Sequence, residues 1–120
     1  MMNAKIQKYG LIVIKGLLTL AFVAAGFAKL SGVEMMVQTF DAVGVGQWLR
    51  YLTGVIEIAG AALLWLPRRQ VFGAGLLGCT MAGAVLAHLF FIGPSAIPAL
   101  ILGLLAAAVA YAHRDQLTPV

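Results

Sequence analysis

The sequence has little charge for a chain of its length. Of its 120 residues, 10% are charged and 62% are hydrophobic, with a mean hydropathy of +1.01. An ordinary soluble domain carries about 25% charged residues. A soluble fold this small also has too much surface to hide so much apolar material. The composition therefore predicts an integral membrane protein.

The sequence also has a single cysteine, Cys79. A dithiol redox centre needs a second cysteine, so none is expected within the chain. Cys79, His88 and His113 do not make a metal site, because His113 belongs to the opposite membrane face. Cys79 lies nine residues from His88 and is predicted to be a packing residue on the opposite helix face. The net charge of +4 is attributed to membrane topology and anionic lipid, and no nucleic-acid partner is expected.

Four stretches are long and apolar enough to cross a bilayer, which takes roughly 20 residues. They cover residues 9–30, 48–67, 70–92 and 96–113. Pro67 ends the second stretch, and "GPSAIP" predicts a tight turn between the third and fourth. Since the spans use nearly all residues, we expect residues 1–120 to form one membrane domain. The predicted fold is all-α, a four-helix transmembrane bundle.

The basic residues are distributed unevenly over the two expected sides. One side holds Lys5, Lys8, Arg68, Arg69 and Arg114, and the other holds Lys29 and Arg50. Cytoplasmic loops carry the excess of Lys and Arg. This multi-pass protein is therefore predicted to have both termini in the cytoplasm, in a bacterial inner membrane. Its first apolar stretch is too long for a signal peptide and is predicted to be a retained helix.

The longest connection, "SGVEMMVQTFDAVGVGQW", mixes apolar and polar residues at helical spacing. It predicts a short amphipathic helix between the first two spans, lying on the outer face and ended by the glycines of "GVG". Such a helix is either an interfacial linker or a lid over a cavity in the bundle. Both interpretations stay open at this point.

Glu57 lies in the middle of the second apolar stretch. It follows Trp48 by nine residues, which places it roughly 13 Å below the outer interface. A carboxylate at this depth should face the protein interior and be paired or protonated. Gly54, Gly60 and Ala61 share its helix face and permit close helix packing.

The first stretch has a matching face that includes Lys15, Gly26 and Lys29. Lys15 is predicted to extend towards the cytoplasmic headgroups. Lys29 extends either outwards or inwards to Glu57, and the sequence does not decide between these two. His88 lies in the outer half of the third stretch.

Lys29, Glu57 and His88 are thus expected at similar depth, one on each of three helices. They form either a proton relay or ligand site, or a buried structural network that sets helix register. In the first case Gly26, Gly54 and Ala84 would leave space for an apolar ligand, which the three polar groups would orient. Further pocket or lid residues would be Phe40, Trp48 and Arg50.

Several segments give the chain a wider resemblance. They are "AFVAAGFAKLSG", "VQTFDAVGVGQWLRYLTGVIEIAGAALLWLPR" and "LLGCTMAGAVLAHL". Through them the chain resembles the DoxX-like family of small bacterial membrane proteins. The resemblance implies a four-helix transmembrane bundle. It also implies links that some relatives have, either to quinone-coupled sulfur oxidation as a subunit of thiosulfate:quinone oxidoreductase or to membrane-associated responses to oxidative stress.

The resulting functional hypothesis is a binding or accessory subunit of a membrane redox system that holds a quinone or a lipid. No catalytic motif is present, so the chain is at most one subunit of a quinone-linked oxidoreductase. Expected partners are the lipid bilayer and other membrane or redox subunits. A quinone is the one candidate cofactor. The first alternative is a small proton-coupled transporter using Glu57, although small multidrug transporters carry this carboxylate on their first helix. The second is an assembly factor or chaperone for a membrane complex.

Overall fold

A computed structural model of the chain describes residues 4–92 and 95–117. Within these residues it is helical and contains no strand. The helices are α1 (Ala4–Ser31), α2 (Glu34–Val43), α3 (Trp48–Leu63), α4 (Gln70–Ala87) and α5 (Ile97–Ala112), together with a π-helical turn η1 (His88–Ile92) and a 3-10 turn η2 (Arg114–Leu117). The all-α prediction is confirmed for this part of the chain.

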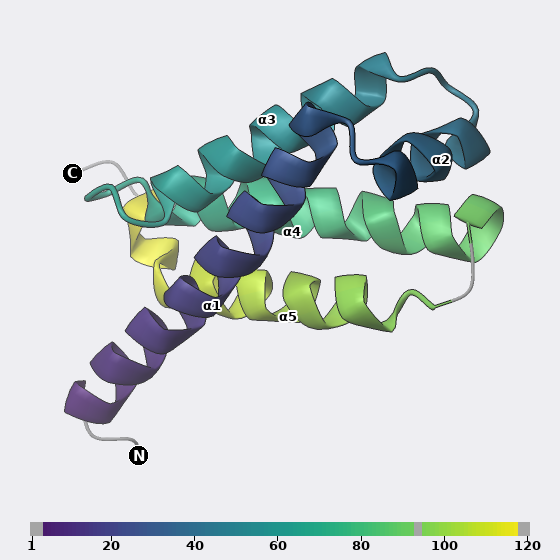
Figure 1. Cartoon of the computed structure of the whole chain (residues 1–120). Coiled ribbons are helices and arrows are strands. Elements are labelled where there is room, and N and C mark those ends of the chain that lie inside the picture. Colours follow the sequence, from purple (N-terminus) through teal and green to yellow (C-terminus); the bar gives the residue numbers. More distant parts are fainter. Residues whose placement is uncertain (1–3, 93–94, 118–120) are drawn as a thin grey trace.

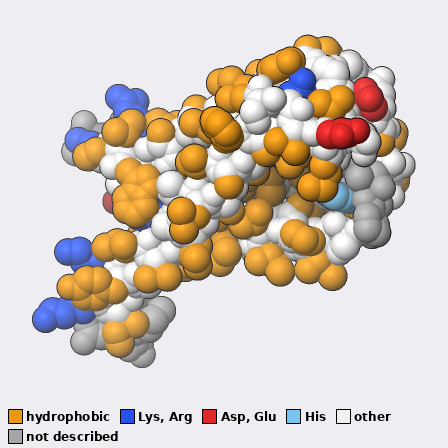
Figure 2. Space-filling view, viewed as in Figure 1, with side chains coloured by type: hydrophobic (Ala, Val, Ile, Leu, Met, Phe, Trp, Pro, Cys, Tyr) orange, Lys and Arg blue, Asp and Glu red, His pale blue; other side chains and the backbone are white. Residues whose placement is uncertain are grey.

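The arrangement in space gives the bundle two distinct ends. Helices α3, α4 and α5 run alongside one another, and α1 crosses α3 obliquely (Figure 1). The start of α1, the turn η2 and the α3–α4 turn lie at one end, which we call the basic end. Helix α2 packs on η1 and α3 at the other end, which we call the lid end. In Figure 2 most of the visible Lys and Arg side chains lie at the basic end, and most of the visible Asp and Glu side chains lie at the lid end.

Within the described ranges, two helices are long and apolar enough to cross a membrane. They are α1, with an 18-residue stretch of mean hydropathy 2.2, and the run Gln70–Phe91, with an 18-residue stretch of mean hydropathy 1.8. Helix α5 is also apolar but has 16 residues. Hydrophobic side chains are spread over the whole length of the face shown in Figure 2. These features are consistent with a membrane protein, while crossing by four helices stays a prediction.

Helix α3 does not stop abruptly at Leu63. Turns continue it through backbone hydrogen bonds such as the one from the N–H of Leu66 to the carbonyl of Leu63, at 3.2 Å. Pro67 then ends the run, and Arg68 takes a left-handed φ of 66°. The predicted end of this stretch therefore agrees with the structure. The predicted turn between α4 and α5 falls partly on residues 93–94, outside the described residues.

The connection between α1 and α3 does contain the expected short helix. Helix α2 ends at Gly44, whose φ of 84° is in the left-handed region that glycine adopts without strain. The N–H of Gly44 donates to the carbonyl of Phe40. The glycines of "GVG" thus end the helix as predicted. Phe40 is its one buried residue.

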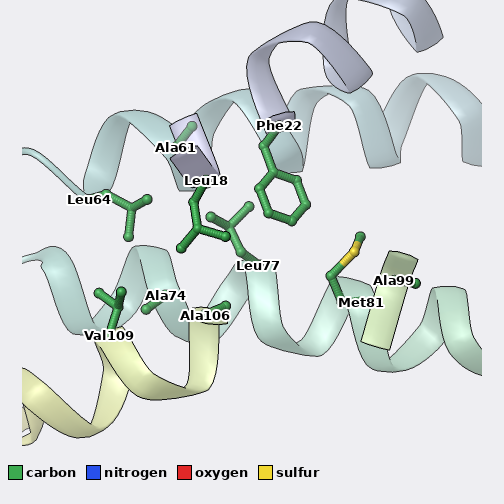
Figure 3. Close-up of a cluster of buried hydrophobic side chains, with 10 residues drawn as sticks. All are labelled: Leu18, Phe22, Ala61, Leu64, Ala74, Leu77, Met81, Ala99, Ala106 and Val109. Atoms are coloured by element: carbon green, nitrogen blue, oxygen red, sulfur yellow. The ribbon is translucent and has the colours of Figure 1, made fainter. Parts of the chain in front are cut away.

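The core lies mainly between the middle of the bundle and the basic end, and it extends to Ala99 at the lid-end start of α5. Its buried side chains come from α1, α3, α4 and α5 and meet in one cluster (Figure 3). Helices α3 and α4 approach closely at Gly60 and Gly73. A Cβ added to Gly73 would lie 2.6 Å from the carbonyl oxygen of Gly60. Only glycine therefore permits this contact, and it brings Leu64 and Leu77 into the core with no exposed surface.

The side chain of Lys15 is more buried than the sequence predicts. It was expected to extend towards headgroups, but 8% of the residue is exposed. Its Nζ lies 5.4 Å from the centroid of the Trp65 ring, and the Trp65 Nε1–H donates to Thr19 Oγ1 at 2.7 Å. The prediction is wrong because α1 crosses α3 here, so that an aromatic ring from the end of α3 covers the ammonium group.

Candidate functional site

The lid end contains a cavity of about 710 Å³. Its walls come from α2, α3, α4 and η1, and Lys29 of α1 completes them. Most of the lining side chains are apolar. Small-molecule sites in proteins typically have volumes of about 300–1,000 Å³ and mostly apolar walls with a few polar groups. Size and lining therefore fit a ligand site.

Lys29 and Glu57 form an ion pair at the wall of this cavity. Lys29 Nζ lies 2.8 Å from Glu57 Oε1, and the exposed fractions of the two side chains are 12% and 2%. Of the two directions that the sequence left open for Lys29, the structure shows the inward one. Glu57 faces the protein interior, as expected for a carboxylate within an apolar helix.

The helix crossing explains why these two side chains meet. Helices α1 and α3 are antiparallel (Figure 1), and they touch at Gly26 and Gly54. Lys29 and Glu57 each follow their glycine by one turn, so they lie on opposite sides of the crossing. Helical side chains lean towards the N-terminus of their own helix. Both side chains therefore lean back towards the crossing and towards each other.

The same crossing corrects the predicted role of the glycines. A Cβ on Gly26 would lie 2.9 Å from the carbonyl oxygen of Gly54, and a Cβ on Gly54 would lie 3.0 Å from the carbonyl oxygen of Gly26. The two glycines therefore bring the backbones together and leave no space between them. Ala84, the third small residue, does line the cavity. The space lies between α3, α4 and the lid, away from the α1–α3 contact.

His88 lies at the start of η1 and also lines the cavity. No described residue hydrogen-bonds to its ring, and its Nδ1 is buried. The sequence predicted a continuous helix here and carried no signal for a π-helical turn. Such turns are rare and frequently occur at functional sites. Because its ring has no hydrogen-bond partner among the described residues, His88 keeps free hydrogen-bonding capacity in the cavity wall.

Cys79 is placed differently from its prediction. It was expected to be a packing residue on the face opposite His88, but it is exposed and lines the same cavity. The reason is the extent of the cavity, which follows α4 and η1 from Cys79 to Phe91. Over this length the cavity borders more than one face of the helix.

The lining threonines are already engaged in their own helices. Thr39, Thr53 and Thr80 each donate their hydroxyl to the carbonyl four residues earlier, at 2.8, 2.7 and 2.7 Å. Helical threonines commonly make this bond. Their hydroxyl hydrogens are therefore not free for a ligand.

The three predicted lid residues are placed in three different ways. Phe40 is 8% exposed and lines the cavity. Trp48 does not line it: the residue is 59% exposed, and its Nε1–H donates to the carbonyl of Val45 at 2.8 Å. Arg50 is 5% exposed and lies outside the lining. Of the three, only Phe40 is in position to touch a ligand.

Arg50, together with Gln47, instead links α2, which we call the lid, to α1 and α3. Its Nε–H donates to Gln47 Oε1 at 2.7 Å, and its Nη1–H donates to the carbonyl of Lys29. Gln47 Nε2–H in turn donates to the carbonyl of Val37 and, at 2.8 Å, to Asp41 Oδ1. Helices α1, α2 and α3 are thus joined through two side chains. The role of Gln47 was not anticipated, because it lies in a connection where helical periodicity carries no information.

The described residues contain no group of His, Cys, Asp and Glu that could hold a metal ion. The chemistry available is an apolar space with an ammonium–carboxylate pair and an imidazole in its wall. Such a site can hold an apolar molecule and donate hydrogen bonds to one polar end.

Comparison with known proteins places this sequence in a family. A protein-family pattern described as the DoxX-like family matches residues 13–112, a range that includes Lys29, Glu57 and His88. The chain is also similar to YdgD of Bacillus subtilis (strain 168), an uncharacterized protein. The two are 36% identical over 94 residues, which cover 74% of this chain and 82% of YdgD. No solved structure matches the chain. The chain belongs to the DoxX-like family.

Proposed function

We propose that this protein is a four-span protein of a bacterial inner membrane whose cavity holds a quinone or a lipid. It would act as a binding or accessory subunit of a membrane redox system. The single observation that carries the proposal is the cavity of about 710 Å³ with Lys29, Glu57 and His88 in its wall. An apolar space with few polar groups suits a molecule with one polar end.

The rim of the cavity supports a ligand that arrives from the bilayer. Several apolar side chains line the cavity and are also largely exposed, among them Met35, Leu52, Leu86, Phe90 and Phe91. In a membrane, such side chains would face lipid. The proposed ligand therefore enters sideways between the lid and α4, without passing through water.

Cys79 offers a direct test of ligand binding. It is the only cysteine in the chain and it lines the cavity. We expect a short-chain quinone or a short-chain lipid to slow saturably the reaction of Cys79 with a small maleimide in purified protein. The control is Cys79→Ala with Ala108→Cys, because Ala108 is exposed on α5 and does not line the cavity. Its labelling rate should not change.

Native mass spectrometry of gently extracted protein provides an independent readout. We expect a co-purifying quinone or lipid, together with any partner subunit. Unprotected Cys79 and the absence of a bound molecule would contradict the proposal.

The proposed orientation can be tested separately. In a Cys79→Ala background, Glu34→Cys on the lid should react only with a reagent applied from outside the cell. Labelling of this position only from the cytoplasmic side would invert the assignment. The five-to-two excess of basic residues at the other side motivates this orientation.

Transport with Glu57 as proton carrier is the competing proposal. A carrier needs its site to open to each side in turn. Here Leu64 and Leu77 have no exposed surface and lie between the cavity and the basic end. This packing favours a binding role over alternating access. Proton uptake into vesicles that depends on Glu57 would favour the transporter instead. The assembly-factor hypothesis would be favoured by native mass spectrometry that finds a membrane partner and no ligand.

A further inference from the structure

We propose that the cavity selects an uncharged amphiphile whose polar end accepts hydrogen bonds. The proposal rests on the function proposed above and narrows its ligand class. It follows from the charge balance of the cavity wall and from the hydrogen-bond donors that the wall leaves free.

The formal charges in the wall cancel. Among the described residues, Lys29 and Glu57 are the only Lys, Arg, Asp or Glu that line the cavity, and they are paired at 2.8 Å. A buried charge requires a partner, and each of these two already has one. An anionic headgroup would have to share Lys29 with Glu57, and the negative charge of Glu57 would repel that headgroup. A cationic headgroup would likewise have to compete with Lys29 for Glu57.

The wall leaves hydrogen-bond donors free, beside the buried acceptor Glu57 Oε1, which has no hydrogen-bond partner among the described residues beyond its ion pair with Lys29. The ammonium group of Lys29 has three hydrogens. Among the described residues that line the cavity, Glu57 is the one carboxylate, and it pairs with this group. Lys29 therefore keeps hydrogens for a ligand. The ring of His88 has no hydrogen-bond partner among the described residues. Thr39, Thr53 and Thr80 have committed their hydrogens to backbone carbonyls. The carbonyl oxygens of a quinone or of a neutral glyceride ester can therefore accept hydrogen bonds from Lys29 and from the N–H of His88.

A series of amphiphiles with equal chains separates these possibilities. The readout is protection of Cys79 from maleimide, at pH 8, above the ordinary titration range of histidine. The probes are a decyl quinone, dioctanoylglycerol, decyl phosphate, decyltrimethylammonium and decane. We expect at least one of the two uncharged carbonyl compounds to bind roughly tenfold or more tightly than each charged probe and than decane. The quinone and glyceride arms distinguish the two sources of a carbonyl acceptor.

Removing the negative charge of Glu57 should make the cavity bind an anionic amphiphile. Glu57→Gln keeps the shape of the side chain but leaves Lys29 without a counter-charge. Decyl phosphate should then bind roughly tenfold more tightly than to the wild type. The double variant Lys29→Met, Glu57→Gln restores neutrality and serves as the matched control. It should again reject decyl phosphate, and it should bind the quinone or glyceride more weakly because the ammonium donor is gone.

The outcomes of this series are distinguishable. Equal protection by charged and uncharged probes would overturn the charge selection while leaving cavity binding intact. Strong binding of decane would overturn the requirement for a polar acceptor. Protection by none of the probes would overturn the proposed function itself. If Glu57→Gln does not fold, the neutral double variant still tests the role of the Lys29 donor.

Discussion

Towards the basic end, Leu18, Leu64 and Leu77 pack with no exposed surface, whereas the lid end encloses a cavity of about 710 Å³ beside a buried ion pair. Both regions use glycine contacts between helices. At the core, Gly60 and Gly73 bring α3 and α4 together, and large aliphatic side chains fill the remaining space. At the lid end, Gly26 and Gly54 bring α1 and α3 together, but α2 and η1 border an open space.

The difference shows how a small bundle can combine stability with a binding site. Protein interiors are close-packed, and empty space costs the contacts that would have filled it. The packed half can hold the helices in register while the lid end stays open. Four substitutions with matched controls test whether the two regions behave this differently, from the largest expected effect to the smallest.

Removing the buried carboxylate of Glu57 should lower the free energy of unfolding more than any of the other substitutions. Glu57→Ala leaves Lys29 buried without a partner, and breaking such a pair typically costs about 3–5 kcal/mol. The free energy of unfolding in detergent, followed by circular dichroism, measures this loss. Adding Lys29→Met to Glu57→Ala should recover part of it. The control is Glu34→Ala on the exposed face of α2, expected to stay within about 0.5 kcal/mol of the wild type. A Glu57→Ala protein as stable as the wild type would contradict the importance of the pair.

Truncating a leucine of α4 should cost much more stability in the packed core than at the cavity. Leu77→Ala opens a void in the packed core and should cost about 3 kcal/mol. Leu86→Ala removes a side chain that is 56% exposed and lines the cavity, so its cost should be under about 1 kcal/mol. Unfolding titrations of both variants compare the two regions directly. Equal losses would mean that the lid end is as tightly packed as the core.

Glycine substitutions on α4 should also diverge. Gly73→Ala places a Cβ 2.6 Å from a backbone oxygen that cannot rotate away, and overpacking of this kind costs about 2 kcal/mol. A Cβ on Gly83 would meet nothing within 4 Å. Gly83→Ala should therefore gain about 0.5 kcal/mol from the higher helix propensity of alanine. Thermal unfolding of the two variants would show shifts of opposite sign, and shifts of the same sign would refute the close α3–α4 contact.

The lid contact should give the smallest effect. Arg50→Lys cannot keep the bonds to both Gln47 and the Lys29 carbonyl, and losing one hydrogen bond costs about 1 kcal/mol. We expect amide hydrogen exchange in α2 to rise roughly fivefold, as such a free-energy change implies. Arg50 lies 4.3 Å from the centroid of the Tyr51 ring, and Arg114 lies 4.0 Å from that of Tyr111 but is exposed, so Arg114→Lys is the matched control. Unchanged exchange in α2 would show that Arg50 does not hold the lid.

Much of the architecture follows from the sequence. Long apolar runs placed α1, α3, α4 with η1, and α5 within a few residues, and the amphipathic pattern with "GVG" placed α2. These patterns are local, so they survive without knowledge of the packing. The inward face of Glu57 followed as well, because a carboxylate within an apolar helix has few other places to go.

The site residues were predicted less completely. The sequence left two directions open for the Lys29 side chain. It did not predict that Trp65 covers the Lys15 ammonium group. Both side chains are long and flexible, so their direction depends on which helices pack around them. The position of Trp48 outside the cavity depends on a local bond to Val45. The exposure of Cys79 depends on how far the cavity extends along α4.

The sequence by itself determined an all-helical chain of the DoxX-like family with one carboxylate buried in an apolar helix, because composition and periodicity act along each helix separately. Only the tertiary structure decided that Lys29 pairs with Glu57, that Arg50 holds the lid, and that space remains beneath it. These features depend on where helices cross. A crossing is set by contacts between residues far apart in the chain, such as Gly26 with Gly54, and no local pattern encodes which residues those will be.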